Sequence, residues 1–202
     1  MSVRASVLRR GAAILALGAL LLTGCTASDP LAQKYGNGGA SNTESNDGAI
    51  LEIAPENRAA APEYSGMTDA GVEVSSADYE GRVVVVNFWY AACGPCRAEA
   101  PDLEALHQKH KDDGVSFIGV NTLDQPENAL AFARKYGITY PSIMDGETGE
   151  VRLAFAGQAS PSAVPTTLVL DKEGRVAARF LGQIVAPGNL DTIIRELVAE
   201  EL

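Results

Sequence analysis

The stretch VVVVNFWYAACGPCRAEAPDLEAL, residues 83–106, sets two cysteines between two elements of regular structure. Its first seven residues form an almost unbroken apolar run, which is typical of a strand covered on both faces. The residues after the cysteines predict a helix that continues to Lys111, with Leu103 and Leu106 on one face. Cys93 therefore lies where a buried strand passes into a helix N-terminus, and the N–H groups and dipole there favour a thiolate.

The rest of the chain alternates between strand and helix patterns. Strands are predicted at residues 72–74, 83–89, 115–120, 166–170 and 176–181, and helices at 93–111, 126–136 and 189–201. In the helix at 126–136 we expect Leu130, Ala133 and Tyr136 to face inward. This order of elements predicts an α/β domain whose sheet carries helices on both faces.

The N-terminus has the pattern of a bacterial export signal. Three arginines precede an apolar segment, residues 11–22, that is shorter than the roughly 20 residues needed to span a bilayer. The sequence LTGC at residues 22–25 is similar to the lipobox of bacterial lipoproteins, which implies cleavage before Cys25 and a diacylglycerol on its thiol. An ordinary secretory signal with an incidental cysteine is the competing interpretation.

The segment after Cys25 is rich in small and polar residues and predicts a disordered tether. We therefore divide the chain into a signal peptide (1–24), a lipidated cysteine with its tether (25–49) and a folded domain (50–202). A lipid anchor at Cys25 would hold the domain on the outer face of the bacterial cytoplasmic membrane.

Composition limits the possible partners. The chain has 202 residues and a formal net charge of −10, and beyond the first 24 residues it carries 13 basic and 26 acidic side chains. A chain this acidic is poorly suited to bind nucleic acid or anionic lipid surfaces. Three cysteines are too few for a disulfide-stapled scaffold, whereas 46% hydrophobic residues suffice for a core.

The Cys-Gly-Pro-Cys motif has three interpretations. Half a zinc site would need two further ligands, and the histidines, His107 and His110, lie far along the predicted helix. A structural disulfide would close a ring too small to restrict the unfolded chain much. A redox-active pair is favoured, in which Cys93 attacks and Cys96, one turn further, resolves. No metal or cofactor is expected besides the redox-active disulfide Cys93–Cys96.

Residues 86–101, together with Val164-Pro165-Thr166, resemble the active site of thioredoxin-like proteins. The resemblance is greatest to the membrane-anchored, extracytoplasmic thiol–disulfide reductases of the TlpA/ResA type, and it covers about residues 64–201. It implies a thioredoxin-like fold, with a central mixed sheet, helices on both faces, a central αβ insertion and an N-terminal strand extension. Residues 140–145 match the insertion.

The resemblance also implies the site. Val164-Pro165 matches the family's cis-proline loop, which faces the cysteines and pairs with the substrate backbone. Glu99 matches a glutamate characteristic of the subfamily, expected to handle protons for the cysteines; a solvated helix residue is the alternative. The expected substrate-binding positions are Gly94, Pro95, Val164, Pro165, Thr166 and Trp89, the last chiefly as packing beneath the site.

Two positions depart from the family pattern. Many members carry Trp immediately before the first cysteine, where this chain has Ala92. Ordinary thioredoxins carry a buried Asp where this chain has Asn87, which leaves Glu99 as the nearby candidate base.

The function implied is reduction of disulfides in exported proteins, with apocytochrome c as the leading candidate substrate. A reductase outside the cell needs electrons from inside, so a membrane electron-donor protein is an expected partner. The competing functions are a peroxiredoxin-type peroxidase, a Cu(I) metallochaperone that binds through Cys93 and Cys96, and an oxidant of client thiols.

Overall fold

Strand β5 (Val83–Trp89) lies inside the main sheet, and all seven of its residues are buried. The computed structural model describes residues 42–45, 47–60, 62–158 and 163–201. β5 pairs in parallel with β6 (Val115–Asn121) and antiparallel with β8 (Thr166–Leu170). The strands predicted at these places are confirmed, and the sheet is mixed.

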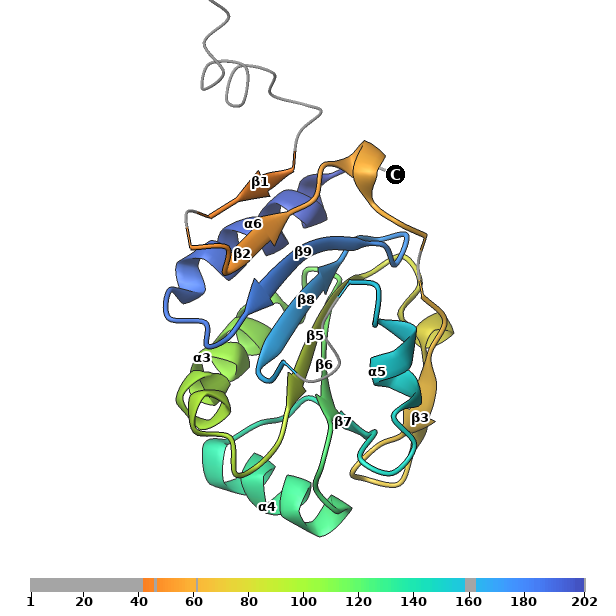
Figure 1. The fold of residues 1–202 in the computed structure, drawn as a ribbon, viewed down its shortest axis with the longest axis vertical. Helices are drawn as coiled ribbons and strands as arrows, with labels where there is room; N and C mark the ends of the chain where they lie inside the picture. The colour runs from red at the N-terminus through yellow and green to blue at the C-terminus, as the bar shows by residue number, and fades with distance from the viewer. Residues whose placement is uncertain (1–41, 46, 61, 159–162, 202) are drawn as a thin grey trace, which may run out of the picture. The chain divides into compact units, whose positions relative to one another are not determined.

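The outer strands of this sheet are β1 (Thr43–Glu44), β2 (Ile50–Glu52), β7 (Ser142–Met144) and β9 (Val176–Leu181). Among the described residues the sheet has seven strands in the order β1-β2-β9-β8-β5-β6-β7 (Figure 1). The N-terminal strands extend the sheet beyond β9, and β7 extends it beyond β6. The predicted N-terminal strand extension and central insertion are therefore confirmed.

Helices cover both faces of the sheet (Figure 1). One face carries α3 (Gly94–His110), α4 (Pro126–Tyr136) and α6 (Pro187–Ala199). The other carries α5 (Glu150–Ala154) and the hairpin of β3 (Ser65–Met67) and β4 (Glu73–Ser75). The valines of β5 alternate between these faces: Val83 and Val85 pack toward α3 and α6, whereas Val84 and Val86 pack toward α5.

Two details of the sequence analysis differ from the structure. β4 begins at Glu73, because Val72 lies 58% exposed in the turn before it. The buried residues of α4 are Ala129 and Phe132, and Phe132 packs against Trp89 with ring centroids 4.3 Å apart. The three residues expected to face inward are half-buried, and of these Tyr136 packs against the cluster around Trp89.

The predicted signal peptide, Cys25 and most of the tether lie outside the described residues. In the part of the chain that the structure describes, no helix is long and apolar enough to cross a membrane. Between the N-terminal strands and the hairpins the chain forms the short 3₁₀ helix η1 (Pro55–Asn57), and a second, η2 (Ser76–Tyr79), follows β4.

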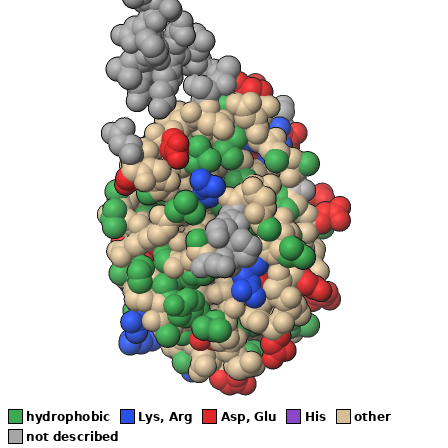
Figure 2. Space-filling model, viewed as in Figure 1, with side chains coloured by type: hydrophobic (Ala, Val, Ile, Leu, Met, Phe, Trp, Pro, Cys, Tyr) green, Lys and Arg blue, Asp and Glu red, His purple; other side chains and the backbone are tan. Residues whose placement is uncertain are grey.

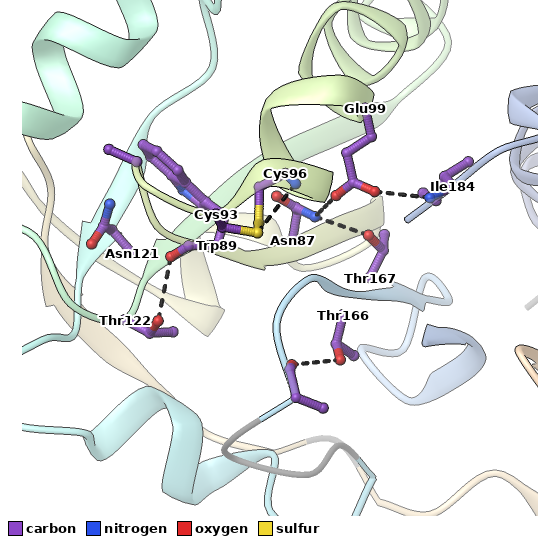
Figure 3. Close-up of a disulfide and its surroundings, with 12 residues drawn as sticks. Asn87, Trp89, Cys93, Cys96, Glu99, Asn121, Thr122, Thr166, Thr167 and Ile184 are labelled. Carbon is purple, nitrogen blue, oxygen red and sulfur yellow. Dashed lines mark hydrogen bonds between the residues drawn. A yellow bond between two sulfur atoms is a disulfide. The ribbon is translucent and has the colours of Figure 1, made fainter. Parts of the chain in front are cut away.

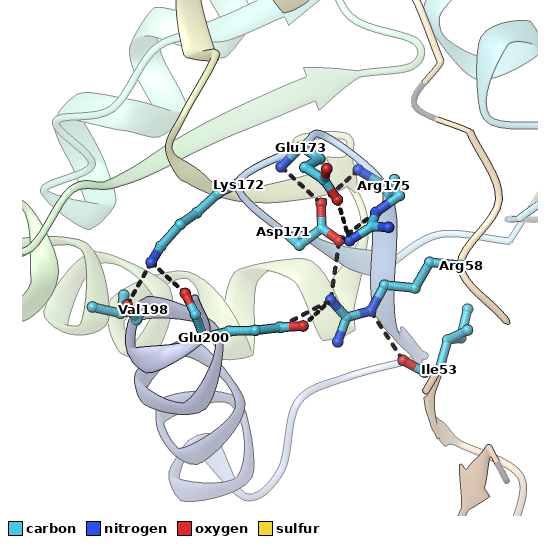
Figure 4. A network of polar contacts seen from close by, with 8 residues as sticks. All are labelled: Ile53, Arg58, Asp171, Lys172, Glu173, Arg175, Val198 and Glu200. Carbon is cyan, nitrogen blue, oxygen red and sulfur yellow. Dashed lines mark hydrogen bonds and ion pairs between the residues drawn. The ribbon is translucent and has the colours of Figure 1, made fainter. Parts of the chain in front are cut away.

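A buried arginine joins three distant parts of the chain (Figure 4). Arg58, whose side chain is 6% exposed, contacts Asp171 Oδ2 at 3.0 Å and Glu200 Oε2 at 2.9 Å. Its Nε donates to the carbonyl of Ile53 at 3.1 Å. Lys172 adds a second connection by donating to the carbonyls of Val198 and Glu200. The N-terminal extension is thereby fixed to the β8–β9 turn and to the end of α6.

We expect Arg58→Met to lower the free energy of unfolding by about 3 kcal/mol, because it leaves buried Asp171 without one of its cations. The loss stays at the low end of the range for buried pairs, since Arg175 Nε still contacts Asp171 at 2.8 Å. Urea unfolding at pH 7 measures the change. Arg195→Ala is the matched control, because that side chain is 60% exposed and such pairs contribute less than about 1 kcal/mol. Equal effects from the two variants would contradict the role given to Arg58.

Candidate active site

Four loops meet at one edge of the sheet. β5, β6 and β9 run in the same direction and end at this edge, while β8 runs oppositely and begins there. The loops that follow β5, β6 and β9 therefore lie near the loop that precedes β8. The Cys-Gly-Pro-Cys motif begins at Cys93, after the short turn of residues 90–92 that follows β5, and it opens α3.

Cys93 and Cys96 form a disulfide at the first turn of α3, with their Cα atoms 5.3 Å apart (Figure 3). Cys93 is the N-cap of the helix, and its Sγ accepts a hydrogen bond from the backbone N–H of Cys96 at 3.2 Å. Cys93 is 4% exposed and Cys96 2%. Both cysteines are therefore buried in the oxidised protein. Gly94 and Pro95 between them are exposed.

Glu99 lies one turn after Cys96 and is only 1% exposed. Its Oε1 accepts from Asn87 Nδ2 at 3.0 Å, and its Oε2 accepts from the backbone N–H of Ile184 at 2.9 Å (Figure 3). Burial raises the pKa of Glu99 to about 7, although the hydrogen bonds from Ile184 and Asn87 act in the opposite direction. The interpretation of Glu99 as a solvated helix residue is wrong.

The Val164–Pro165 peptide bond is cis, as the resemblance implied. Val164 packs against the cluster that contains both cysteines, so the structure brings this loop to the disulfide. The carbonyl of Pro165 accepts from the N–H of Gly182 at 2.9 Å, which joins the loop to the end of β9. Val164 is half-buried, whereas Pro165 is buried.

Besides buried Pro165, two more of the positions expected to bind substrate are covered in this structure. Thr166 is 0% exposed, and its hydroxyl donates to the carbonyl of Ala163 at 2.7 Å, so it fixes the cis-proline loop. Trp89 is 6% exposed and donates from Nε1 to Ser142 Oγ at 3.1 Å. Gly119 makes that contact possible, because a Cβ there would collide with both partners. Neither Trp89 nor Thr166 presents its side chain to a substrate in this conformation.

The sequence analysis missed the loop after β6. Asp124 Oδ2 accepts from the backbone N–H of Ala91 at 2.6 Å and from Asn121 Nδ2 at 2.9 Å. The N–H of Thr122 donates to the carbonyl of Trp89 at 3.0 Å. These contacts fix the turn that precedes Cys93. Asn121 and Asp124 could have been predicted as site residues, because they are polar and lie at or just after the end of a strand parallel to β5. Parallel strands end at the same edge of a sheet.

The histidines that a zinc site would need have other partners. His110 lies 2.7 Å from Asp191 and 3.2 Å from Asp113. His107 packs against the rings of Phe117 and Tyr140. Within the described ranges, no group of three or more His, Cys, Asp or Glu side chains is arranged to hold a metal ion.

The comparisons with known proteins agree with this geometry. The family model described as Redoxin matches residues 55–194. The thiol-disulfide oxidoreductase ResA of Geobacillus thermodenitrificans is 30% identical over 122 residues, which are 60% of this chain and 67% of that protein. The thioredoxin-like protein YneN of Bacillus subtilis is 32% identical over 134 residues, or 65% of this chain and 75% of that protein.

Solved structures show the same likeness. A secreted thiol-disulfide isomerase from Corynebacterium glutamicum is 31% identical with a TM-score of 0.70, covering 81% of this chain and all of that chain (100%). A DsbF homologue from Corynebacterium diphtheriae is 34% identical with a TM-score of 0.67, covering 78% of this chain and 99% of that one. This chain belongs to the Redoxin family, and it is a thioredoxin-like thiol–disulfide oxidoreductase of the ResA/TlpA type.

Proposed function

We propose that the protein reduces disulfides of exported proteins through a Cys93/Cys96 dithiol. The observation that carries the proposal is the pairing of a Cys-Gly-Pro-Cys disulfide at a helix N-terminus with a buried carboxyl group one turn below it. The helix N-terminus stabilises a thiolate on Cys93, and the carboxyl group of Glu99 is a proton acceptor within the protein.

The first step forms a mixed disulfide. The thiolate of Cys93 attacks one sulfur of the substrate disulfide, the substrate S–S bond breaks, and the second substrate sulfur leaves as a thiolate that takes a proton. The backbone N–H of Cys96, which donates to Cys93 Sγ at 3.2 Å, favours the attacking thiolate. Gly94, Pro95 and Val164 are the positions around the sulfurs that a substrate can contact.

The second step releases the reduced substrate. Cys96 passes its thiol proton to Glu99, and the Cys96 thiolate attacks Cys93 Sγ. The mixed disulfide breaks, the Cys93–Cys96 disulfide forms, and the remaining substrate sulfur leaves as a thiolate. Two electrons move from the dithiol to the substrate, so the enzyme then needs an external reductant. A pKa of Glu99 near 7 suits this exchange, because the group then accepts and returns a proton near neutral pH.

The proposed location is the outer face of the bacterial cytoplasmic membrane, with a lipid anchor at Cys25 and a membrane electron-donor protein as partner. The export-signal pattern and lipobox-like LTGC support the anchor. A relative named ResA and a neighbour described as a secreted isomerase support a site of action outside the cytoplasm. Apocytochrome c is the client we propose to test first, among other exported disulfide proteins.

The surface is consistent with protein clients. Figure 2 shows hydrophobic side chains gathered over the lower left of this face, where α3 and α4 lie in Figure 1, and acidic side chains along the right-hand edge. The helix that begins with the cysteine motif is thus bordered by apolar surface, which suits contact with a protein chain.

In an assay of insulin reduction by dithiothreitol, the rate with Cys93→Ser is expected to fall to the uncatalysed background, because the variant lacks the attacking sulfur. Cys96→Ser is expected to lose turnover but to accumulate a mixed disulfide, visible as an added mass on a non-reducing gel. Turnover that survives in Cys93→Ser would refute the proposed function.

The reduction potential of the Cys93/Cys96 pair tests the direction of electron flow. We expect a value at or below about −230 mV after equilibration with thiol buffers, in the range of thioredoxin and glutaredoxins. A value close to about −120 mV, typical of a disulfide donor, would assign the protein to oxidation of client thiols instead.

The buried carboxyl group should make the oxidised protein less stable as the pH rises. The pKa of Glu99 is about 7 in the folded protein against 4.5 for the free group, so the folded state binds the proton more tightly. Its stabilising contribution is complete below about pH 4.5 and is lost by about pH 7, a change of about 3 kcal/mol. Urea unfolding of wild type and Glu99→Gln at pH 4.5 and pH 8 measures it.

The difference in unfolding free energy, wild type minus Glu99→Gln, should fall by that amount between the two pH values. Glu127→Gln on the exposed side of α4 is the control and should retain the wild-type slope. A difference that does not change with pH would show that Glu99 titrates normally.

A further inference from the structure

The carboxyl group of Glu99 has hydrogen bonds that suit only its ionised form. Each oxygen accepts from an N–H group, one from Asn87 Nδ2 at 3.0 Å and one from Ile184 N at 2.9 Å. A protonated carboxyl group has an O–H that must donate, and a backbone N–H cannot accept it. Protonation therefore requires a change on the side of Asn87.

Asn87 and Thr167 are able to make that change together. Asn87 Nδ2 donates both to Glu99 and to Thr167 Oγ1, each at 3.0 Å (Figure 3). An amide that turns by 180° places its oxygen where its nitrogen was, and that oxygen has two lone pairs in place of two N–H groups. A threonine hydroxyl either accepts or donates, so the same two contacts persist with their direction reversed.

We propose that Asn87 and Thr167 form a reversible hydrogen-bond relay that keeps Glu99 fully hydrogen-bonded both with and without its proton. With Glu99 ionised, Asn87 donates to Glu99 and to Thr167. With Glu99 protonated, the turned amide of Asn87 accepts from Glu99 and from Thr167. The relay rests on the proposed function only in its purpose, which is to let Glu99 take the Cys96 proton. Asn87 and Thr167 are positioning residues, because they act through Glu99.

Solvent has little room to replace this relay. Asn87 is 5% exposed, and Thr167 and Glu99 are 0% and 1% exposed. The cavity that Asn87 and Cys96 both line measures about 10 Å³, enough for about one water molecule. Without Thr167 as acceptor, an N–H of Asn87 would have at most that water as a partner, and an unpaired buried N–H is unfavourable.

Few titratable groups face Glu99 from the surrounding elements. Cys96 lies on the same helix and shares the cavity with Asn87. Tyr140, before β7, has a pKa raised above its ordinary range, chiefly by burial, with smaller contributions from Glu104 and Glu99. Asn87, Thr167 and Ile184, which contact the carboxyl group or its amide partner, carry no charge.

The relay predicts a direction for Thr167→Val. Without the Thr167 hydroxyl, one N–H of Asn87 has no acceptor when Glu99 is ionised. When Glu99 is protonated, only one lone pair of the Asn87 carbonyl lacks a donor, and this costs less free energy than the unpaired N–H. The pKa of Glu99 should rise by about one unit, a tenfold gain in proton affinity. Thr167→Ser retains the hydroxyl and should leave the pKa within about 0.3 units of wild type.

Infrared difference titration of the purified oxidised protein measures this pKa from the carbonyl stretch of protonated Glu99, with Glu99→Gln as the blank. A merely structural Thr167 would give the opposite pattern, because valine preserves the packed methyl group and serine removes it. Equal pKa values in Thr167→Val and wild type would overturn the relay.

A second measurement needs no substitution. In wild-type protein, nuclear Overhauser contacts between the Asn87 amide protons and the Thr167 side chain should be present above the Glu99 midpoint and lost below it. Contacts that persist through the titration would also overturn the relay. Both measurements use the oxidised protein and no client, so they are independent of turnover: Cys93→Ser tests the function, and these titrations test the relay.

Discussion

The absence of any exposed face on β5 is the constraint on which the rest of this protein depends. A strand of seven buried residues must be covered twice, so the sheet requires α3, α4 and α6 on one side and α5 with the β3–β4 hairpin on the other. The chain continues from the end of β5 through a short turn into α3. The cysteines are therefore placed at the end of the most completely buried strand of the sheet.

Neighbouring loops make hydrogen bonds to that junction from both sides. The loop after β6 holds the turn before Cys93 through Asp124 and Asn121, and the loop after β9 holds Glu99 through Ile184. The cis-proline loop is in turn tied to the end of β9 through Gly182. Three loops with no sequence proximity thus fix the positions of two sulfurs and one carboxyl group.

A buried carboxyl group lowers stability at neutral pH, so folding alone gives no reason for Glu99 at this position. Hydrogen bonds from Asn87 and Ile184 only partly offset the loss of water around Glu99, so its pKa stays near 7. Stability is supplied elsewhere, by the two apolar clusters and by the Arg58 network that joins the N-terminal extension to α6.

The sequence alone determined the strands at 83–89 and 166–170 and the helix that begins at the cysteines, because these depend on local pattern. The cis-proline loop followed from the resemblance to thioredoxin-like proteins. The resemblance also indicated Glu99. Only the tertiary structure decided that Glu99 is buried, that Thr166 and Trp89 are covered, and that Asn121 and Asp124 hold the active-site turn. Burial and hydrogen-bond partners depend on which distant segments pack together, and no local pattern records that.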